Sequence, residues 1–346
     1  MGDSIVDLPI EEYYAHALQM HERELQIRDE IVGWLPDDII DAHAHCNLKE
    51  HVHGVDPRAR GHMLSTFPYF PLEMSKQLHE MFFPGKRIRS LRFPKTFRGI
   101  DHRSANQYLL QNSPEEDRIA LFGLPEDVAY TNAMLAHPRV SALKMYWSYV
   151  DPTAKTIYEF FRPEILEESQ ARDIPIVLHL PRVLVASIND LVQVVKDFPR
   201  QRVVLAHLGL SKMVIQGLEE TMKTAAAFDN VFMDTALNPS AEVVSLALKC
   251  FGKERILFGS DEPLSLIRSV AYRHPQKGER IVTDFKYHWV DSDEVREYGH
   301  LAQSATHAHW QSMLAIKRAV ELLPRDQQEV TKDWVFRKTA EAVYNF

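Results

Sequence analysis

The chain has 346 residues, 45% of them hydrophobic and 25% charged, which is typical of a soluble folded protein and excludes collagen, a disordered chain and a disulfide scaffold. Its formal net charge of -8 leaves no positive excess to bind a phosphate backbone, so we expect no nucleic-acid partner. We find no secretory signal, no apolar run of membrane-spanning length, and only two cysteines, Cys46 and Cys250. We therefore expect a cytoplasmic protein without a membrane partner.

The N-terminal segment predicts one long helix. Apolar side chains recur at helical spacing over residues 9–32, and Gly33 and Pro36 follow as stop signals. We interpret residues 1–37 as a helical lead-in.

From residue 38 onward, short β-rich runs alternate with helical patterns. The eight runs are Ile39 to His45, Ser90 to Phe93, Ile119 to Leu124, Ala142 to Trp147, Ile174 to Leu180, Val203 to Leu208, Val231 to Thr235 and Ile256 to Ser260. Helical patterns occupy residues 126–137, 155–171, 187–197, 213–227 and 241–251. This alternation predicts βα units on a parallel sheet, and eight units make a TIM barrel. We therefore predict a single (β/α)8 barrel over residues 38–346.

Two connections are longer than ordinary barrel loops. Residues 46–89 follow the first predicted strand, and residues 262–330 follow the eighth. Connections of this length usually carry function or secondary structure of their own. We expect both insertions to cap the C-terminal face of the barrel, where catalytic groups of this fold lie.

Metal-binding side chains end four of the predicted strands. Asp41, His43 and His45 alternate along the first strand, so the period of two predicts that they share one face. The fifth, sixth and eighth runs end in His179, His207 and Asp261. Barrel closure would join four imidazoles and one carboxylate, a donor set that suits zinc, iron, nickel or copper better than magnesium or calcium.

These strand ends resemble the motifs of a known enzyme superfamily. The segments Asp41-Ala42-His43-Ala44-His45, Leu178-His179, Ala206-His207-Leu208-Gly209 and Phe258-Gly259-Ser260-Asp261 are similar to those of the amidohydrolase superfamily, and their order resembles its amidohydrolase family 2. That branch contains metal-dependent decarboxylases, lactonases, hydratases and hydrolases. The resemblance covers residues 38–261 and extends weakly to a closing helix over Arg337 to Phe346.

The resemblance implies a role for each strand-end residue. His43, His45, His179 and Asp261 would be metal ligands, and His207 would be a ligand or a substrate contact. It further implies a cytoplasmic homodimer or homotetramer. The expected cofactor is one divalent transition metal, with zinc as the first choice and manganese or iron as alternatives.

Charge then suggests the chemistry. A divalent metal with an open position lowers the pKa of bound water to about 7. Asp261 would accept the proton of that water and His207 would polarise a substrate carbonyl; in a decarboxylase, Asp261 or a histidine would protonate the carbon that loses carbon dioxide. We expect a small or aromatic carboxylic acid as substrate, with the choice between hydrolysis and decarboxylation left open.

Lys144 allows two interpretations. It lies in phase with Tyr146 on the fourth predicted strand, so both should face one side. In binuclear members of the superfamily a lysine on this strand is carbamylated and bridges two metals. The alternative, which we favour, is an ammonium group that anchors a substrate carboxylate or pairs with an aspartate beside a single metal.

Other charged residues are candidates for substrate binding. Arg92, Lys95 and Arg182 follow or end predicted strands and could bind an anion, although solvated loop charges are the plain alternative. Glu262 replaces the aromatic or small residue usual in the branch and would put an extra carboxylate near the metal.

Two further histidine pairs are ambiguous. His51 and His53 in the first insertion could reach a second metal, but a surface pair is the favoured interpretation. His307 and His309 lie in a helical pattern over residues 300–323, where positions two apart face different directions, so joint chelation is disfavoured. Either one alone could close over the site.

The aromatic residues of the first insertion also have two interpretations. They could line a hydrophobic pocket for an aromatic acid, or pack in the core or at a dimer contact, which we favour. They are Phe67, Tyr69, Phe70, Phe82 and Phe83.

Two alternatives to hydrolysis or decarboxylation stay open. A nitrogen and carboxylate site also suits a non-haem di-iron oxygenase that hydroxylates natural products, with two irons per chain as its signature. A metal-binding barrel that has lost catalysis is the second alternative, although such a relative usually loses at least one ligand.

Overall fold

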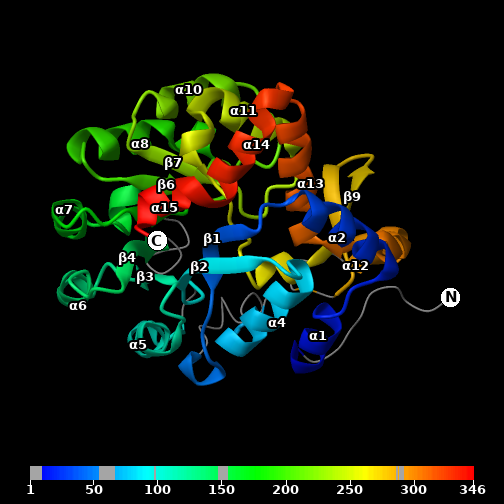
Figure 1. The fold of residues 1–346 in the computed structure, drawn as a ribbon, viewed down its shortest axis with the longest axis horizontal. Helices are drawn as coiled ribbons and strands as arrows, with labels where there is room; N and C mark the ends of the chain where they lie inside the picture. The colour runs from blue at the N-terminus through cyan, green and yellow to red at the C-terminus, as the bar shows by residue number, and fades with distance from the viewer. Residues whose placement is uncertain (1–9, 54–66, 97–98, 147–154, 286, 288–291) are drawn as a thin grey trace.

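The computed structural model describes residues 10–53, 67–96, 99–146, 155–285, 287 and 292–346. Eight parallel strands pair in chain order: β1 (Asp38–His45), β2 (Arg87–Phe93), β3 (Arg118–Phe122), β4 (Val140–Met145), β5 (Ile176–Leu178), β6 (Val203–Leu205), β7 (Val231–Asp234) and β8 (Ile256–Leu257). The amide of Ala42 donates to Phe258 O over 2.9 Å, and the amide of Asp261 donates to His43 O over 2.8 Å. These bonds join β8 to β1, so the predicted (β/α)8 barrel is confirmed (Figure 1).

Helices surround the strands. In chain order they are α4 (Leu72–Phe82), α5 (His102–Asn112), α6 (Val128–Met134), α7 (Pro163–Ala171), α8 (Leu184–Asp197), α9 (His207–Leu210), α10 (Leu218–Ala226), α11 (Ala241–Phe251), α13 (Ala308–Glu321) and α14 (Arg325–Asp333). Shorter turns are η1 (Lys49–His51), η3 (Ile157–Glu159), η4 (Lys253–Arg255) and η5 (Leu264–Leu266). No helix of the described residues is long and apolar enough to span a membrane.

The C-terminal segment closes the N-terminal end of the barrel. The π-helical turn η7 (Trp334–Lys338) leads into α15 (Thr339–Tyr344), whose Val343 and Tyr344 pack against the apolar side chains inside the barrel. Arg118 at the start of β3 donates to Asn345 O, and Arg202 before β6 donates to Val343 O. The segment therefore fills the N-terminal mouth of the barrel, and the opposite, C-terminal mouth stays available for a functional site.

The predicted helix over residues 9–32 is wrong as a single element. The chain forms α1 (Ile10–Ala17) and α2 (Glu22–Trp34), and between them the carbonyls of Ala17 and Gln19 accept hydrogen bonds from His307 and Arg268. Side chains from distant parts of the chain therefore bind carbonyl groups that would accept backbone hydrogen bonds in a continuous helix. The pattern over residues 155–171 is broken too, because Pro163 lacks an amide hydrogen and begins α7 rather than continuing a helix.

Both insertions carry secondary structure of their own. The described part of the first contains α4, which packs beside β2 as a barrel helix (Figure 1). The second contains a small antiparallel sheet of β9 (Arg268–His274), β10 (Gly278–Thr283) and β11 (Thr306–His307), together with α12 (Ser292–Tyr298) and η6 (Gly299–Ser304). The helix predicted over residues 300–323 is thus replaced by η6, β11 and α13, and His307 lies in a strand.

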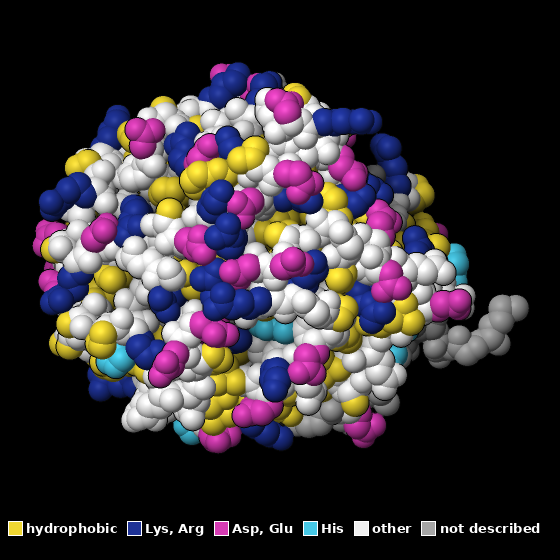
Figure 2. Space-filling model, in the orientation of Figure 1, with side chains coloured by type: hydrophobic (Ala, Val, Ile, Leu, Met, Phe, Trp, Pro, Cys, Tyr) yellow, Lys and Arg dark blue, Asp and Glu magenta, His cyan; other side chains and the backbone are white. Residues whose placement is uncertain are grey.

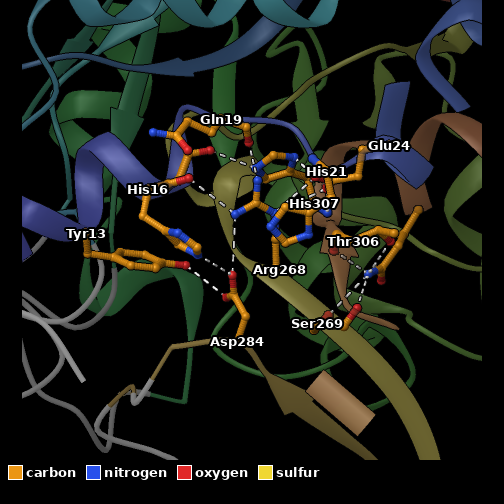
Figure 3. A network of polar contacts seen from close by, with 12 residues as sticks. Tyr13, His16, Gln19, His21, Glu24, Arg268, Ser269, Asp284, Thr306 and His307 are labelled. Carbon is orange, nitrogen blue, oxygen red and sulfur yellow. Dashed lines mark hydrogen bonds and ion pairs between the residues drawn. The ribbon is translucent and has the colours of Figure 1, made fainter. Parts of the chain in front are cut away.

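A buried ionic network joins the N-terminal helices to this small sheet (Figure 3). Nε of Arg268 in β9 lies 3.1 Å from Glu24 Oε2 in α2, and Nη1 lies 3.4 Å from Asp284 Oδ2. The backbone amide of His307 donates to Glu24 Oε1 over 2.7 Å, and Tyr13 donates to Asp284 Oδ1 over 3.0 Å. Arg268 and Glu24 are both fully buried, so their charges depend on each other for compensation.

Replacing Arg268 by methionine tests this dependence. Arg268→Met leaves two buried carboxylates without their cation, so we expect the free energy of unfolding to fall by about 3–5 kcal/mol. Urea denaturation followed by circular dichroism measures the change. The control is Arg28→Met, which removes an ion pair to the exposed Asp29 and should cost under about 1 kcal/mol. Equal stability losses in the two variants would contradict the role given to Arg268.

Candidate metal centre

A pocket of about 80 Å³ lies where the C-terminal ends of the barrel strands meet. Its lining residues are His43, His45, Lys95, Thr96, Lys144, Tyr146, His179, His207, Asp261 and Leu264. The fold therefore brings together the four histidines and the aspartate that the strand ends predicted. The ring centroids of His43 and His207 are 5.0 Å apart, and those of His179 and His207 are 5.2 Å apart.

The four histidine rings share one hydrogen-bonding pattern. Nδ1 of each ring lies within hydrogen-bond distance of an oxygen that can only accept. The pairs are His43 with Asp234 Oδ2 at 2.8 Å, His45 with Pro94 O at 2.9 Å, His179 with Leu180 O at 3.0 Å and His207 with Ala236 O at 3.0 Å. A neutral imidazole carries one N–H, so each ring holds its proton on Nδ1 and keeps a lone pair on Nε2.

Three of those lone pairs lie around the carboxylate of Asp261. Oδ1 of Asp261 lies 3.0 Å from His45 Nε2 and 3.5 Å from His43 Nε2, and Oδ2 lies 3.9 Å from His207 Nε2. Asp261 Oδ1 is buried and makes no hydrogen bond. An acceptor that faces other acceptors without a proton between them needs a cation. The donor set therefore fits a transition metal.

Burial controls the protonation of these groups. It lowers the pKa of His43, His45 and His207, and it lowers that of His179 well below the usual value. Burial alone would raise the pKa of Asp261, but the neighbouring histidines, His43 foremost, outweigh it and lower that pKa. Neutral imidazoles beside an ionised carboxylate are the forms that bind metals.

Local backbone geometry places two of these residues. His207 and Asp261 have positive φ angles, of 57° and 58°, which are sparsely populated for side chains other than glycine and which cluster at functional sites. Gly259 lies beside His43, because a Cβ on Gly259 would come within 2.8 Å of the His43 Cβ. The Phe258-Gly259-Ser260-Asp261 segment can therefore approach β1 closely only with glycine at this position.

Two lysines and a tyrosine complete the pocket wall. Lys144 and Tyr146 both line it, as their shared phase on the strand predicted. Burial lowers the pKa of Lys144 and of Lys95 to about 8 in each case, against the opposing effect of nearby aspartates. Burial, followed by Asp261, raises the pKa of Tyr146. At neutral pH the lysines are mostly cationic, and the phenol is neutral.

Asp41 does not share a face of β1 with His43 and His45, contrary to the prediction. The register of β1 against β2 shifts between Asp41 and Ala44, and this bulge separates Asp41 from the two histidines. Asp41 Oδ1 accepts from the amides of His43 and Ser260, over 3.0 Å and 2.8 Å. Asp41 is thus a buried support for the backbone of β1 and β8 and does not line the pocket.

Arg92 and Glu262 also lie outside the pocket. Arg92 Nε lies 2.5 Å from Asp117 Oδ2, and Arg92 Nη1 lies 3.1 Å from Glu262 Oε1. These ion pairs are buried between the barrel wall and α4, so the position of these residues does not support the expected contact with substrate. Arg182 is exposed, and its guanidinium donates to Lys155 O.

The other histidine pairs do not join the described pocket. His51 is buried and accepts from the amide of Leu48, whereas His53 is exposed. His307 belongs to the Arg268 network, and the ring of His309 stacks on Phe82 at a centroid distance of 4.0 Å.

The aromatic residues of the first insertion are core residues. Phe67, Phe70, Phe82 and Phe83 are buried in the main apolar core, with Tyr69 packed against it, and none of them lines the pocket. The predicted alternative of core packing is therefore the one the structure supports.

Asp234 is the supporting residue that the sequence interpretation missed. It ends β7, and its carboxylate receives His43 Nδ1 at 2.8 Å and the amide of His207 at 2.8 Å. The signal was present, because Asp234 stands one position before the end of the seventh β-rich run, as His179 and His207 do in theirs. It was overlooked because an aspartate at a strand end does not by itself distinguish a ligand from a support.

Comparison with known proteins places the chain in a family. The family model described as Amidohydrolase matches residues 40–346, so the chain belongs to the amidohydrolase family that its motifs resemble. It is accordingly a metal-dependent hydrolase or carboxy-lyase. No curated protein matches the chain.

Solved structures share the barrel at low sequence identity. One is an amidohydrolase from Burkholderia multivorans with bound zinc, at 12% identity and TM-score 0.56, covering 89% of this chain and 99% of that one. A second is 5-carboxyvanillate decarboxylase from Novosphingobium aromaticivorans, complexed with manganese and 4-hydroxy-3-methoxy-5-nitrobenzoic acid, at 11% identity and TM-score 0.56, covering 91% and 97%. A third is a putative 2-pyrone-4,6-dicarboxylic acid hydrolase from Pseudomonas putida, at 16% identity and TM-score 0.54, covering 90% and 98%. At these identities the likeness shows the fold.

Substitution of Asp234 tests the orientation of His43. Asp234→Asn presents an amide that can donate to Nδ1 and favours the tautomer with the proton on Nε2, so we expect metal affinity to fall about 10- to 100-fold. Competition with a chromophoric chelator measures the affinity. Asp197→Asn, on the surface of α8, is the control and should bind metal like the wild type. Unchanged affinity in Asp234→Asn would show that this carboxylate does not set the tautomer.

Proposed function

We propose that the protein holds one divalent transition metal and acts on a small or aromatic carboxylic acid by hydrolysis or non-oxidative decarboxylation. The observation that supports it is the convergence of the Nε2 lone pairs of His43, His45 and His207 on the carboxylate of Asp261, with His179 lining the same pocket. In this proposal His43, His45, His179 and Asp261 are ligands, and His207 is a fifth ligand or a substrate contact. Zinc is the first choice of metal, with manganese or iron as alternatives.

The residues around the metal have separate tasks. When bound, the metal supplies an activated water or an electrophilic contact for a substrate oxygen. Asp261 is ionised and would accept a proton from water in hydrolysis. In decarboxylation it would take up a proton from solvent and pass it to the substrate carbon, while the bond from that carbon to the carboxylate breaks and carbon dioxide leaves. His207 Nε2 points into the pocket beside Asp261, where it contacts a polarised carbonyl.

The two buried lysines support an acidic substrate. Lys144 and Lys95 put two ammonium groups on a pocket whose anionic lining residue is Asp261. A carboxylate entering this pocket meets the ammonium groups of Lys144 and Lys95, and Tyr146 offers a neutral phenol as a further donor. This arrangement suits a carboxylic acid and disfavours a cationic substrate.

Metal analysis of the purified protein tests the centre. We expect about one transition metal per chain in the wild type and a large loss in His179→Ala, because one ligand is removed from a small site. His53→Ala removes an exposed histidine and should keep the metal. If the wild type holds no more metal than His179→Ala, the proposed centre is wrong. Two irons per chain would instead support the di-iron oxygenase.

Assays with aromatic mono- and dicarboxylic acids then identify the reaction. Carbon dioxide release without oxygen consumption indicates decarboxylation, and formation of a new acid from an ester, lactone or amide indicates hydrolysis. A fully loaded protein that converts none of these acids would favour the non-catalytic barrel.

Lys144 is tested separately. In Lys144→Met we expect KM for the acid to rise about 10- to 100-fold, because a charge-assisted hydrogen bond is lost, while the metal content stays at one per chain. Steady-state kinetics and metal analysis of the same preparation give both values. A fall from two metals to one would show that Lys144 bridges them as a carbamate, and an unchanged KM would remove it from substrate binding.

A further inference from the structure

Glu262 makes contacts on both sides of the barrel wall, through its backbone on one side and its side chain on the other. It directly follows Asp261, and its backbone carbonyl accepts the amide hydrogen of His45 over 2.9 Å. Its own amide donates to Ser260 Oγ over 3.0 Å, and Ser260 is in turn held by Asp41. The backbone of this residue therefore touches the segments that carry two of the proposed metal ligands.

The side chain of Glu262 points the other way, toward α4 and β2. Oε1 accepts from Ser75 Oγ over 2.7 Å and from Arg92 Nη1 over 3.1 Å, and Oε2 lies 3.1 Å from His79 Nε2. Glu262 is fully buried. Its carboxylate is thus fixed by a cation from the barrel strand β2 and by a hydroxyl and an imidazole from α4.

A second cavity reaches this cluster from the surface. It has a volume of about 680 Å³, and His79, Arg92 and Asp117 are among its lining residues. It lies along α4 and β2, and Figure 2 shows histidine atoms near the middle of this face, surrounded by lysine, arginine and acidic side chains. Small molecules can therefore approach His79 without passing through the metal pocket.

We propose that Glu262 is a positioning residue: its carboxylate, held by Arg92, Ser75 and His79, fixes the backbone that carries Asp261 and bonds to His45, and so sets the affinity of the centre for its metal. This inference rests on the proposed function. Glu262 does not touch the substrate or the metal, because its carboxylate lies on the far side of the barrel wall from the pocket. It acts only through the position of Asp261 and His45.

The first test compares two buried glutamates. Glu262→Gln keeps the shape of the side chain and removes the charge that holds Arg92 and His79. We expect the zinc dissociation constant, measured by equilibrating the purified holoprotein with a chromophoric chelator, to rise about 10- to 100-fold. Glu24→Gln is the matched control, because Glu24 is also fully buried and paired with an arginine and a histidine, but lies in the Arg268 network. It should lower Tm and leave the zinc dissociation constant within about twofold, as expected for a distant site.

A second variant covers the case in which Glu262→Gln fails to fold. His79→Ala keeps the pair between Glu262 and Arg92 and opens a space continuous with the surface cavity. We expect weaker zinc binding that added imidazole restores, relative to wild type in the same imidazole concentration. Imidazole should not restore Glu262→Gln, since His79 still fills that space and the carboxylate that would bind imidazole is gone.

The outcomes separate this proposal from the proposed function. If the wild type binds no zinc, both are wrong. If the wild type binds zinc and both Glu262→Gln and His79→Ala bind it equally well, only the positioning role is wrong. If Glu24→Gln weakens zinc binding as much as Glu262→Gln does, the effect is general destabilisation, and the positioning role is also overturned.

Discussion

The arrangement of acceptors around the four imidazoles is the constraint on which the rest of the site depends. Each ring gives its Nδ1 proton to a fixed oxygen, so the Nε2 lone pairs of His43, His45 and His207 face the carboxylate of Asp261, whose Oδ1 makes no hydrogen bond. In a dry pocket this is unfavourable unless a cation enters, because lone pairs that face each other repel. Repulsion between the imidazole lone pairs and the carboxylate therefore destabilises the site without a metal, and a bound cation would relieve this repulsion.

Three of those four acceptors are backbone carbonyls, so the ring orientations depend on the course of the chain after each strand. Pro94, Leu180 and Ala236 each follow a strand of the barrel. The positive φ angles at His207 and Asp261 belong to the turns after two other strands, β6 and β8. The barrel tolerates strained turns that orient side chains, because the strands that precede these turns are buried and paired.

The strand order and the convergence of four histidines and Asp261 on one pocket could be predicted from the sequence, because a barrel repeats one short unit and strand ends share one rim. What could not be predicted depends on contacts between distant segments. Asp41 has the same phase as His43 and His45, and only the bulge against β2 turns it away. Glu262 directly follows Asp261, yet its side chain pairs with Arg92 and His79 on the outer side of the barrel wall. The break between α1 and α2 likewise depends on donors from Arg268 and His307, far along the chain.

The Arg268 network also bears on the order in which the chain can complete its fold during synthesis. Glu24 and Arg268 are separated by 244 positions, and both are buried in the finished molecule. On the ribosome, the first helices emerge long before their cationic partner does, so Glu24 must remain hydrated until the last third of the chain is made. The N-terminal helices are therefore among the last elements to reach their final packing, although they are the first to be translated.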